Sequence, residues 1–127
     1  MDSKDTDIQN REDLYAIVCL FYEKLFSDTQ MAPFFKAFRQ PESLEKHLQI
    51  LVDFWDNILF YSGSYTKNAM LPHIEMNKKI PFKSEHFKLW MHYFTEAVDS
   101  LYSGEHSEII KSRAQSIATV MQIKIVH

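Results

Sequence analysis

The sequence predicts an all-α fold built from four long helices. Along four stretches of the chain, apolar residues recur at intervals of three and four, and no stretch shows the strict alternation of a half-buried strand. The 2 glycines and 4 prolines lie between these stretches or at a first helical position. Aromatic residues make up 14% of the 127 residues, and most occupy helical core positions. We therefore expect one helical domain that lines something large or packs unusually bulky side chains.

Composition and charge exclude several classes of protein. The formal net charge is -3, and Lys and Arg are spread along the chain, so the sequence lacks the basic stripe that nucleic-acid binding requires. No run approaches the roughly 18 apolar residues of a membrane span, and the acidic residues 1–7 lack the apolar segment of a signal peptide. The single cysteine, Cys19, has no partner for an internal disulfide. We expect a cytoplasmic protein without nucleic-acid or membrane partners.

The N-terminal part of the chain is predicted to be an arm followed by a helix. Residues 1–10 are polar and are expected to be a flexible arm, ahead of one domain over residues 11–127. Asn10 is the expected N-cap of a helix that begins with acidic residues in its first turn. Tyr22 lies on the apolar face of this helix, so its hydroxyl needs an interior partner unless it reaches solvent or a backbone carbonyl. That face consists of Leu14, Ile17, Val18, Phe21, Tyr22, Leu25 and Phe26.

Aromatic side chains cluster in residues 31–38, just before the second long helix. Pro33 suits the first turn of a short helix, and one of the three phenylalanine rings can stack on a planar ligand. The next helix is predicted from Pro41 to about Tyr61. His47 occupies an apolar position in it, either as a core histidine bonded to a neighbouring group or as a ligand-facing one. The three rings belong to Phe34, Phe35 and Phe38.

A connector is predicted over residues 62–82, which is long for a compact domain and therefore typical of a functional segment. Within it, His73 follows Pro72 directly, so a loop or a single helical turn holds the imidazole. A histidine in a connector is ordinarily a solvated surface residue. Paired with His47 on the preceding helix, however, His73 becomes a candidate ligand of a haem iron.

Two further helices complete the predicted domain. Ser84 is the expected cap of a helix that runs to Ser103, and Gly104 is well placed to stop it. Trp90 lies in the middle of its apolar stripe, and the indole N–H needs an acceptor there. The last helix is predicted over residues 107–125, with small residues that allow close packing.

The sequence lacks the signatures of most catalytic centres. It contains no His-Glu-x-x-His, no Cys-x-x-Cys and no glycine-rich phosphate loop. One histidine on a connector, one facing the core, a buried Tyr and a buried Trp remain, surrounded by Phe, Met and Leu. This set suits a haem between helices, because an imidazole can ligate iron while apolar side chains sandwich the ring. The haem would be non-covalent, since no Cys-x-x-Cys-His occurs.

An ordered set of short matches resembles the truncated haemoglobins, specifically group III, over about residues 11–125. The presence of only Gly63 and Gly104 also favours group III, because groups I and II typically carry paired glycines near helix ends. The resemblance implies a globin-like, two-over-two helical sandwich with a proximal segment that is mostly loop. The matches are Phe21-Tyr22-Glu23-Lys24, Pro33-Phe34-Phe35, His47 followed by Phe54-Trp55, Leu71-Pro72-His73, Pro81-Phe82, and Trp90 followed by Phe94.

The resemblance also implies a role for each site residue around a heme b group. His73 matches the proximal iron ligand, and Tyr22 and Trp90 match the pair that hydrogen-bonds bound oxygen. His47 matches the distal gate, and Phe35 the ring-stacking phenylalanine, with Phe34 as the competing choice. The remaining expected cofactor-binding residues are Leu51 and Phe54 over the distal pocket, Met70 beside His73, and Lys78 and Lys79, which either pair the haem propionates or are solvated.

The function that the resemblance implies is binding of O2, NO and CO at a pentacoordinate haem iron. Two distal hydrogen-bond donors should slow oxygen release, which favours oxygen, nitric oxide or peroxide chemistry over bulk transport. Activity of the nitric oxide dioxygenase or peroxidase type would require an electron donor or reductase as partner. Two alternatives stay open: a haem-free helical interaction or sensor module, and an electron-transfer protein in which His47 also ligates iron.

Overall fold

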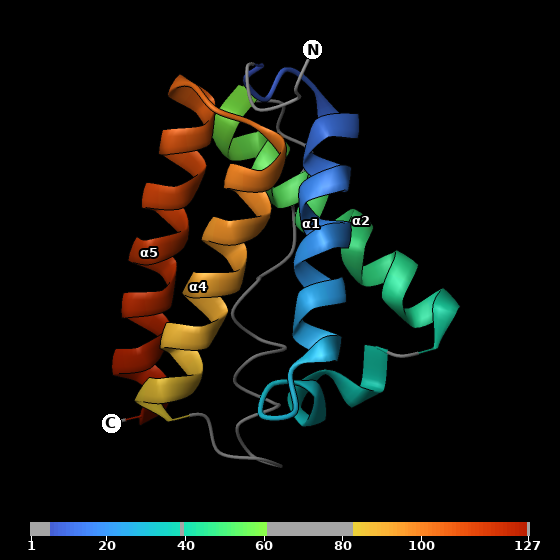
Figure 1. The fold of residues 1–127 in the computed structure, drawn as a ribbon, viewed down its shortest axis with the longest axis vertical. Coiled ribbons are helices and arrows are strands. Elements are labelled where there is room, and N and C mark those ends of the chain that lie inside the picture. The colour runs from blue at the N-terminus through green and yellow to red at the C-terminus, as the bar shows by residue number, and fades with distance from the viewer. Residues whose placement is uncertain (1–5, 39, 61–82, 127) are drawn as a thin grey trace.

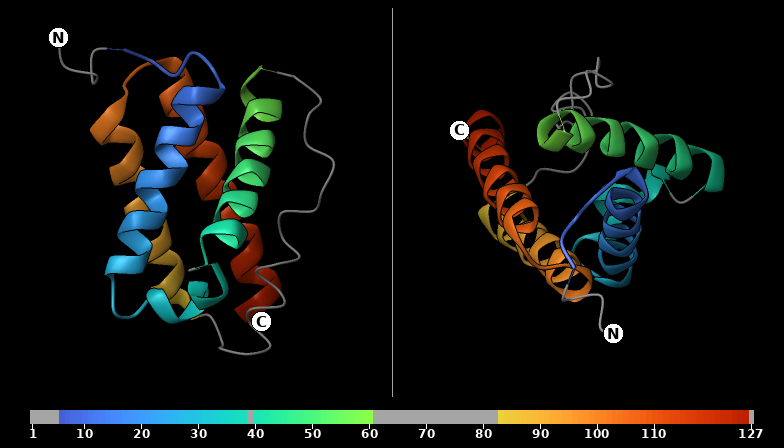
Figure 2. Two further views of the ribbon diagram at one scale, coloured as in Figure 1. Left: turned by 90° about the vertical axis from the view of Figure 1, so that its right-hand side faces the viewer. Right: turned by 90° about the horizontal axis from the view of Figure 1, so that it is seen from above.

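The computed structural model describes residues 6–38, 40–60 and 83–126, and these residues form helices without any strand. The all-α prediction is therefore confirmed. In Figure 1, α4 ascends and α5 descends beside it as an antiparallel pair, while α1 packs against α4 and α2 crosses behind α1. Viewed from above, α4 and α5 form one layer and α1 and α2 the other (Figure 2). The elements are α1 (Arg11–Ser27), the 3-10 segment η2 (Ala32–Phe38), α2 (Pro41–Phe60), α4 (Ser84–Leu101) and α5 (Glu105–Val126).

Two of the predicted helix starts are confirmed and two are wrong. α1 begins at Arg11, and the Asn10 side chain accepts a hydrogen bond from the Asp13 N–H at 3.0 Å. α2 begins at Pro41, as predicted. α4 has Lys83 as its N-cap, with Ser84 already helical, and α5 begins at Glu105 rather than at residue 107. The C-terminal end of α4 also comes earlier than predicted, at Leu101.

The early start of α5 has a cause that lies about a hundred residues away in the sequence. The Asp7 carboxylate accepts hydrogen bonds from the backbone N–H groups of His106 and Ser107 at 2.7 and 2.9 Å, and from the Ser107 hydroxyl at 2.8 Å. Gly104 has φ +141° there, and a Cβ at this position would lie 2.5 Å from the Asp7 Cγ. Asp7 therefore caps α5 in place of a local residue, and only glycine allows this approach.

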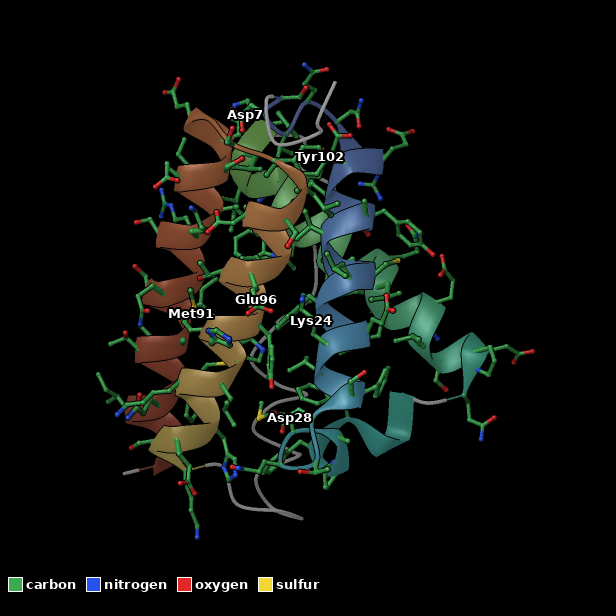
Figure 3. The ribbon with its side chains drawn as sticks, in the orientation of Figure 1. Asp7, Lys24, Asp28, Met91, Glu96 and Tyr102 are labelled. Carbon is green, nitrogen blue, oxygen red and sulfur yellow. The ribbon has the colours of Figure 1, made fainter. Side chains whose placement is uncertain are left out.

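The same contacts bear on the predicted arm at residues 1–10. Residues 1–5 lie outside the described part of the chain. Ile8, by contrast, is fully buried in the core, and the Ser103 N–H donates to the Thr6 carbonyl at 3.0 Å. From Thr6 onward the chain is thus packed against the turn between α4 and α5, and Figure 3 shows Asp7 beside that turn.

Removing the Asp7 cap is expected to destabilise the fold measurably. We expect Asp7→Ala to lower the free energy of unfolding by about 1–2 kcal/mol, because two N–H groups at the start of α5 lose their acceptor. Partial burial raises the pKa of Asp7, but hydrogen bonds from His106, Ser107 and Ile8 outweigh it and hold the pKa below the ordinary value of 3.8. The contribution of Asp7 is therefore present above pH 3.8 and is lost as the pH falls through the lower, folded-state pKa.

Urea denaturation of wild type and variant between pH 2.5 and 7 measures this difference. Asp99→Ala is the matched control, since Asp99 also precedes α5 but its side chain is 54% exposed and pairs only with Lys111 among the described contacts. We expect the control to lie within about 0.5 kcal/mol of wild type. Equal stability of Asp7→Ala and Asp99→Ala at pH 7 would contradict the capping role.

Ion pairs join α1 to its neighbour α2 in the same layer and to α4 in the other layer. The Arg11 guanidinium bonds Asp53 at 2.7 Å and Asp56 at 3.2 Å, which ties the start of α1 to α2. Lys24 bonds Glu96 at 2.9 Å, and Figure 3 shows these two side chains meeting between α1 and α4. These ion pairs help to hold α1 in position relative to α2 and α4, and α1 carries Tyr22 between them.

Within the described ranges, no helix combines the length and apolar character that crossing a membrane requires.

Candidate functional site

A buried hydrogen bond between Tyr22 and His47 joins α1 to α2. The Tyr22 hydroxyl oxygen lies 2.6 Å from His47 Nε2. Tyr22 is 2% exposed and His47 is 7% exposed. Burial raises the pKa of Tyr22 well above its ordinary value of 10, so the hydroxyl stays protonated at physiological pH. The interior partner that the sequence required for Tyr22 is therefore an imidazole.

Aromatic rings fix the Tyr22 ring on several sides. Phe35 and His47 both meet it edge-on, at centroid distances of 5.4 and 5.3 Å. Phe35 is fully buried, and its dihedral angles (φ -110°, ψ 15°) interrupt η2 and bring the ring inward. The Phe34 ring instead packs against the His86 ring, at a centroid distance of 4.6 Å. Of the two competing phenylalanines, Phe35 is thus the one in contact with Tyr22.

A small apolar cavity of about 40 Å³ opens beside Tyr22. Its walls include the predicted residues Tyr22, Leu51, Phe54 and Trp90, which come from three different helices. The volume suffices for a water or a diatomic molecule, and the lining is almost entirely hydrocarbon. The other wall residues are Val18, Phe21, Trp55, Phe94, Ile117 and Met121.

Two residues of this largely apolar wall, Trp55 and Trp90, carry a polar indole N–H. Trp90 stacks on Phe94 with an interplanar angle of 5°, and Trp55 stacks on the same ring at 26°. Both residues are at least nine-tenths buried, and the described part of the chain supplies no hydrogen-bond acceptor to either indole N–H. The site thus offers buried donors to a ligand that can accept hydrogen bonds.

Several predicted site residues lie outside the described ranges. These are the proposed iron ligand His73, its neighbour Met70, and the two proposed propionate partners Lys78 and Lys79. Their assignments remain predictions. Of the predicted site, the described part of the chain therefore contains only the residues predicted for the distal side.

Comparison with known proteins assigns the fold to a family. No protein-family model matches the chain. It is 29% identical over 115 residues to the group 3 truncated haemoglobin of Campylobacter jejuni, and the aligned residues cover 89% of this chain and 88% of that protein. A crystal structure of group III truncated haemoglobin from Campylobacter jejuni matches with a TM-score of 0.83 and 28% identity, over 95% and 94% of the two chains. The chain has the truncated-globin fold, and its sequence is similar to the group III truncated haemoglobins. The resemblance proposed from the sequence motifs is confirmed.

Haem is the cofactor that this family of truncated globins implies, and the chemistry of the described residues fits it. The wall formed by Leu51, Phe54 and Phe94 is apolar, as a porphyrin face requires, and the same cavity is lined by Tyr22 and Trp90, whose side chains carry hydrogen-bond donors. The described residues contain no group of three or more His, Cys, Asp or Glu side chains that could hold a metal by themselves.

The cavity also has wall residues that the sequence did not assign to the site. Trp55, Phe94 and Ile117 line the cavity, but in the sequence they occupy apolar helical positions like any core residue. The only signal that could have singled out Trp55 is its indole N–H, which a buried position must satisfy or leave unpaired. Phe94 and Ile117 carry no polar group, so their place at the cavity follows from the tertiary structure alone.

Proposed function

We propose that this truncated globin binds a heme b group and uses it to bind O2, NO and CO. The observation that carries the proposal is the buried side chain of Tyr22, which lines an apolar cavity together with Trp90 and whose hydroxyl lies 2.6 Å from His47 Nε2. Bound haem supplies an iron that takes up diatomic ligands and can react with peroxide. We expect oxygen, nitric oxide or peroxide chemistry, with a reductase as electron donor, rather than bulk oxygen transport.

The proposed haem contacts follow from the family resemblance and from the cavity walls. His73 would ligate the iron, while Leu51 and Phe54 would contact the porphyrin from the distal side. Phe35 is favoured over Phe34 as a ring contact because it touches Tyr22. Met70, Lys78 and Lys79 complete the proposed set.

Within the cavity, the protein's own groups determine how a small ligand is held. With the proton of His47 on Nε2, the imidazole donates to the Tyr22 oxygen. The Tyr22 hydroxyl, uncharged because burial raises its pKa, can then donate its own proton to a ligand that carries partial negative charge. The Trp90 N–H is a second donor from α4. Hydrocarbon walls exclude water, so both donors act in a medium of low dielectric constant, where such bonds are stronger. This arrangement favours slow release of a polar diatomic ligand.

His47 also bears on the alternative in which two histidines ligate the iron. Its Nε2 atom is the one that bonds Tyr22, so the imidazole must break this bond before that nitrogen can reach an iron. The arrangement therefore favours a gating role for His47 over permanent ligation. We further propose a cytoplasmic location, because Cys19, the single thiol, suits a reducing compartment.

The test is an absorption spectrum of the purified protein in its oxidised, reduced, and reduced plus CO states. We expect a Soret band that shifts when CO is added, and a reduced form without a second histidine ligand. A reduced spectrum typical of two axial histidines would favour the electron-transfer alternative. A colourless protein that also fails to take up added haemin would overturn the haem proposal and favour the haem-free module.

A further inference from the structure

The turn between α1 and η2 is organised by one carboxylate, that of Asp28. The backbone N–H groups of Gln30 and Met31 donate to its Oδ1 atom at 2.7 and 3.0 Å. The Ala32 N–H donates to the Asp28 carbonyl at 2.9 Å, and η2 begins at this residue. Met31 is fully buried, so the turn is seated in the core. Asp28 therefore determines where η2 starts relative to α1.

A tyrosine of α4 bonds the same carboxylate from the other layer of helices. The Tyr93 hydroxyl donates to Oδ2 of Asp28, whereas the two N–H groups of the turn use Oδ1. This bond is the main cause that holds the pKa of Asp28 below its ordinary value of 3.8, so the acceptor is charged at neutral pH. Hydrogen bonds to a charged acceptor are stronger than those between neutral groups. The start of η2 is thus tied to α4, and Figure 3 shows Asp28 at the lower end of α1.

The position of η2 matters for the site because Phe35 lies on it. Phe35 is fully buried and meets the Tyr22 ring edge-on at a centroid distance of 5.4 Å. The Tyr22 hydroxyl in turn lies 2.6 Å from His47 Nε2. Close packing in a protein interior passes a shift of one side chain on to its neighbours. A displacement of η2 would therefore move the Phe35 ring and redirect the Tyr22 hydroxyl.

We propose that Tyr93 is a positioning residue: through Asp28 it fixes η2 against α4 and thereby sets the direction of the Tyr22 hydroxyl. Tyr93 does this from outside the cavity wall, and Phe35 transmits the effect. The positioning of Tyr22 does not require bound haem, whereas any effect on oxygen release rests on the function proposed above. The two consequences are therefore measured separately.

The first measurement is a carbon-13 NMR spectrum of the full-length protein, with its tyrosines labelled at Cζ, the ring carbon that bears the hydroxyl. A protein that contains haem is reduced and saturated with CO, and a colourless protein is used as purified. The spectrum of Tyr22→Phe identifies the Tyr22 signal, because that signal disappears. Tyr93→Phe keeps the ring and removes only the hydroxyl, and it should shift the Tyr22 signal.

The matched control is Tyr102→Phe, which removes the same group just after the end of α4. The Tyr102 hydroxyl donates to Asp13 at 3.0 Å, so it also joins this part of the chain to α1. Asp13 lies in the first turn of α1, however, at the opposite end of that helix from η2. The Tyr22 signal in this control should therefore stay where it is in wild type.

The second measurement is the rate of oxygen dissociation from the haem-containing protein. Tyr93→Phe should raise this rate about 2–10-fold, which corresponds to the net free energy of an ordinary hydrogen bond. In the Tyr22→Phe background the same substitution should have no further effect, because Tyr93 acts only through the Tyr22 hydroxyl. A merely structural role of Tyr93 would instead give the same factor in both backgrounds.

The outcomes separate the positioning role from the proposed function. An unchanged Tyr22 signal in Tyr93→Phe, an equal shift in Tyr102→Phe, or a rate factor that persists without the Tyr22 hydroxyl would each overturn the positioning role. A colourless protein that fails to take up haemin, but in which Tyr93→Phe alone shifts the Tyr22 signal, would overturn the proposed function and support the positioning role.

Discussion

Replacing His73 by Ala is expected to abolish stable haem binding. Removing the iron ligand should weaken haem retention by more than the roughly 10–100-fold that is typical when a residue that hydrogen-bonds a metal ligand is lost. The ratio of Soret to protein absorbance after gel filtration measures this loss. Free imidazole added to His73→Ala should restore the spectrum, which shows that the variant has kept its fold and lacks only the ligand.

The matched control is His92→Ala, since the His92 side chain is 60% exposed on α4 and contacts Glu96 at the surface. This control should retain haem in the same proportion as wild type. Full haem retention in His73→Ala, with an unchanged shift on adding CO, would remove His73 as the proximal ligand. In that case the iron ligand must be sought among the other histidines.

Replacing Tyr22 by Phe is expected to speed oxygen dissociation about 10–100-fold. The estimate comes from the roughly 1.5–3 kcal/mol that a hydrogen bond to a charged acceptor contributes in proteins. The ring remains in place against Phe35, so only the hydroxyl is lost. Stopped-flow mixing of the oxygenated protein with excess CO measures the rate. Because burial raises the pKa of Tyr22, its hydroxyl should contribute no pH dependence to this rate between pH 6 and 9.

Tyr15→Phe is the control for this experiment. It makes the same change on α1, but the Tyr15 hydroxyl bonds Glu45 at 2.6 Å near the surface and does not reach the cavity. Its oxygen dissociation rate should match that of wild type. If neither Tyr22→Phe nor Trp90→Leu changes the rate, the assignment of these two residues as distal donors is wrong.

The sequence predicted the four long helices because their apolar periodicity is strong and uninterrupted. It also predicted an interior partner for Tyr22, because its hydroxyl lies on an apolar face, and that partner is His47. Periodicity cannot show which helices meet, however, so the contact between Tyr22 and Phe35 depended on the break within η2. Trp55 and Phe94 were missed for the same reason.

Of the helix ends that a cap defines, only those whose capping residue is the usual type and lies next to the helix in the sequence were predicted correctly. Asn10 was predicted correctly as a cap because its acceptor acts within three residues. Ser84 and the start of α5 were wrong because their caps are unusual: His86 bonds the Lys83 N–H, and Asp7 reaches α5 from the other end of the chain. Neither arrangement matches the Ser, Thr, Asp or Asn placed next to a helix that the rules anticipate.

The position of Asp7 has a consequence for the order in which the molecule assembles. A contact between Asp7 and Ser107 closes a loop of 100 residues, which carries a large entropic cost if it must form early. Asp7 emerges from the ribosome long before α5, and it can bond α5 only after α1 and α4 have brought the two ends together. We therefore expect the start of α5 to become ordered late in folding, and to be the first helical end to exchange its amide hydrogens when the native protein opens.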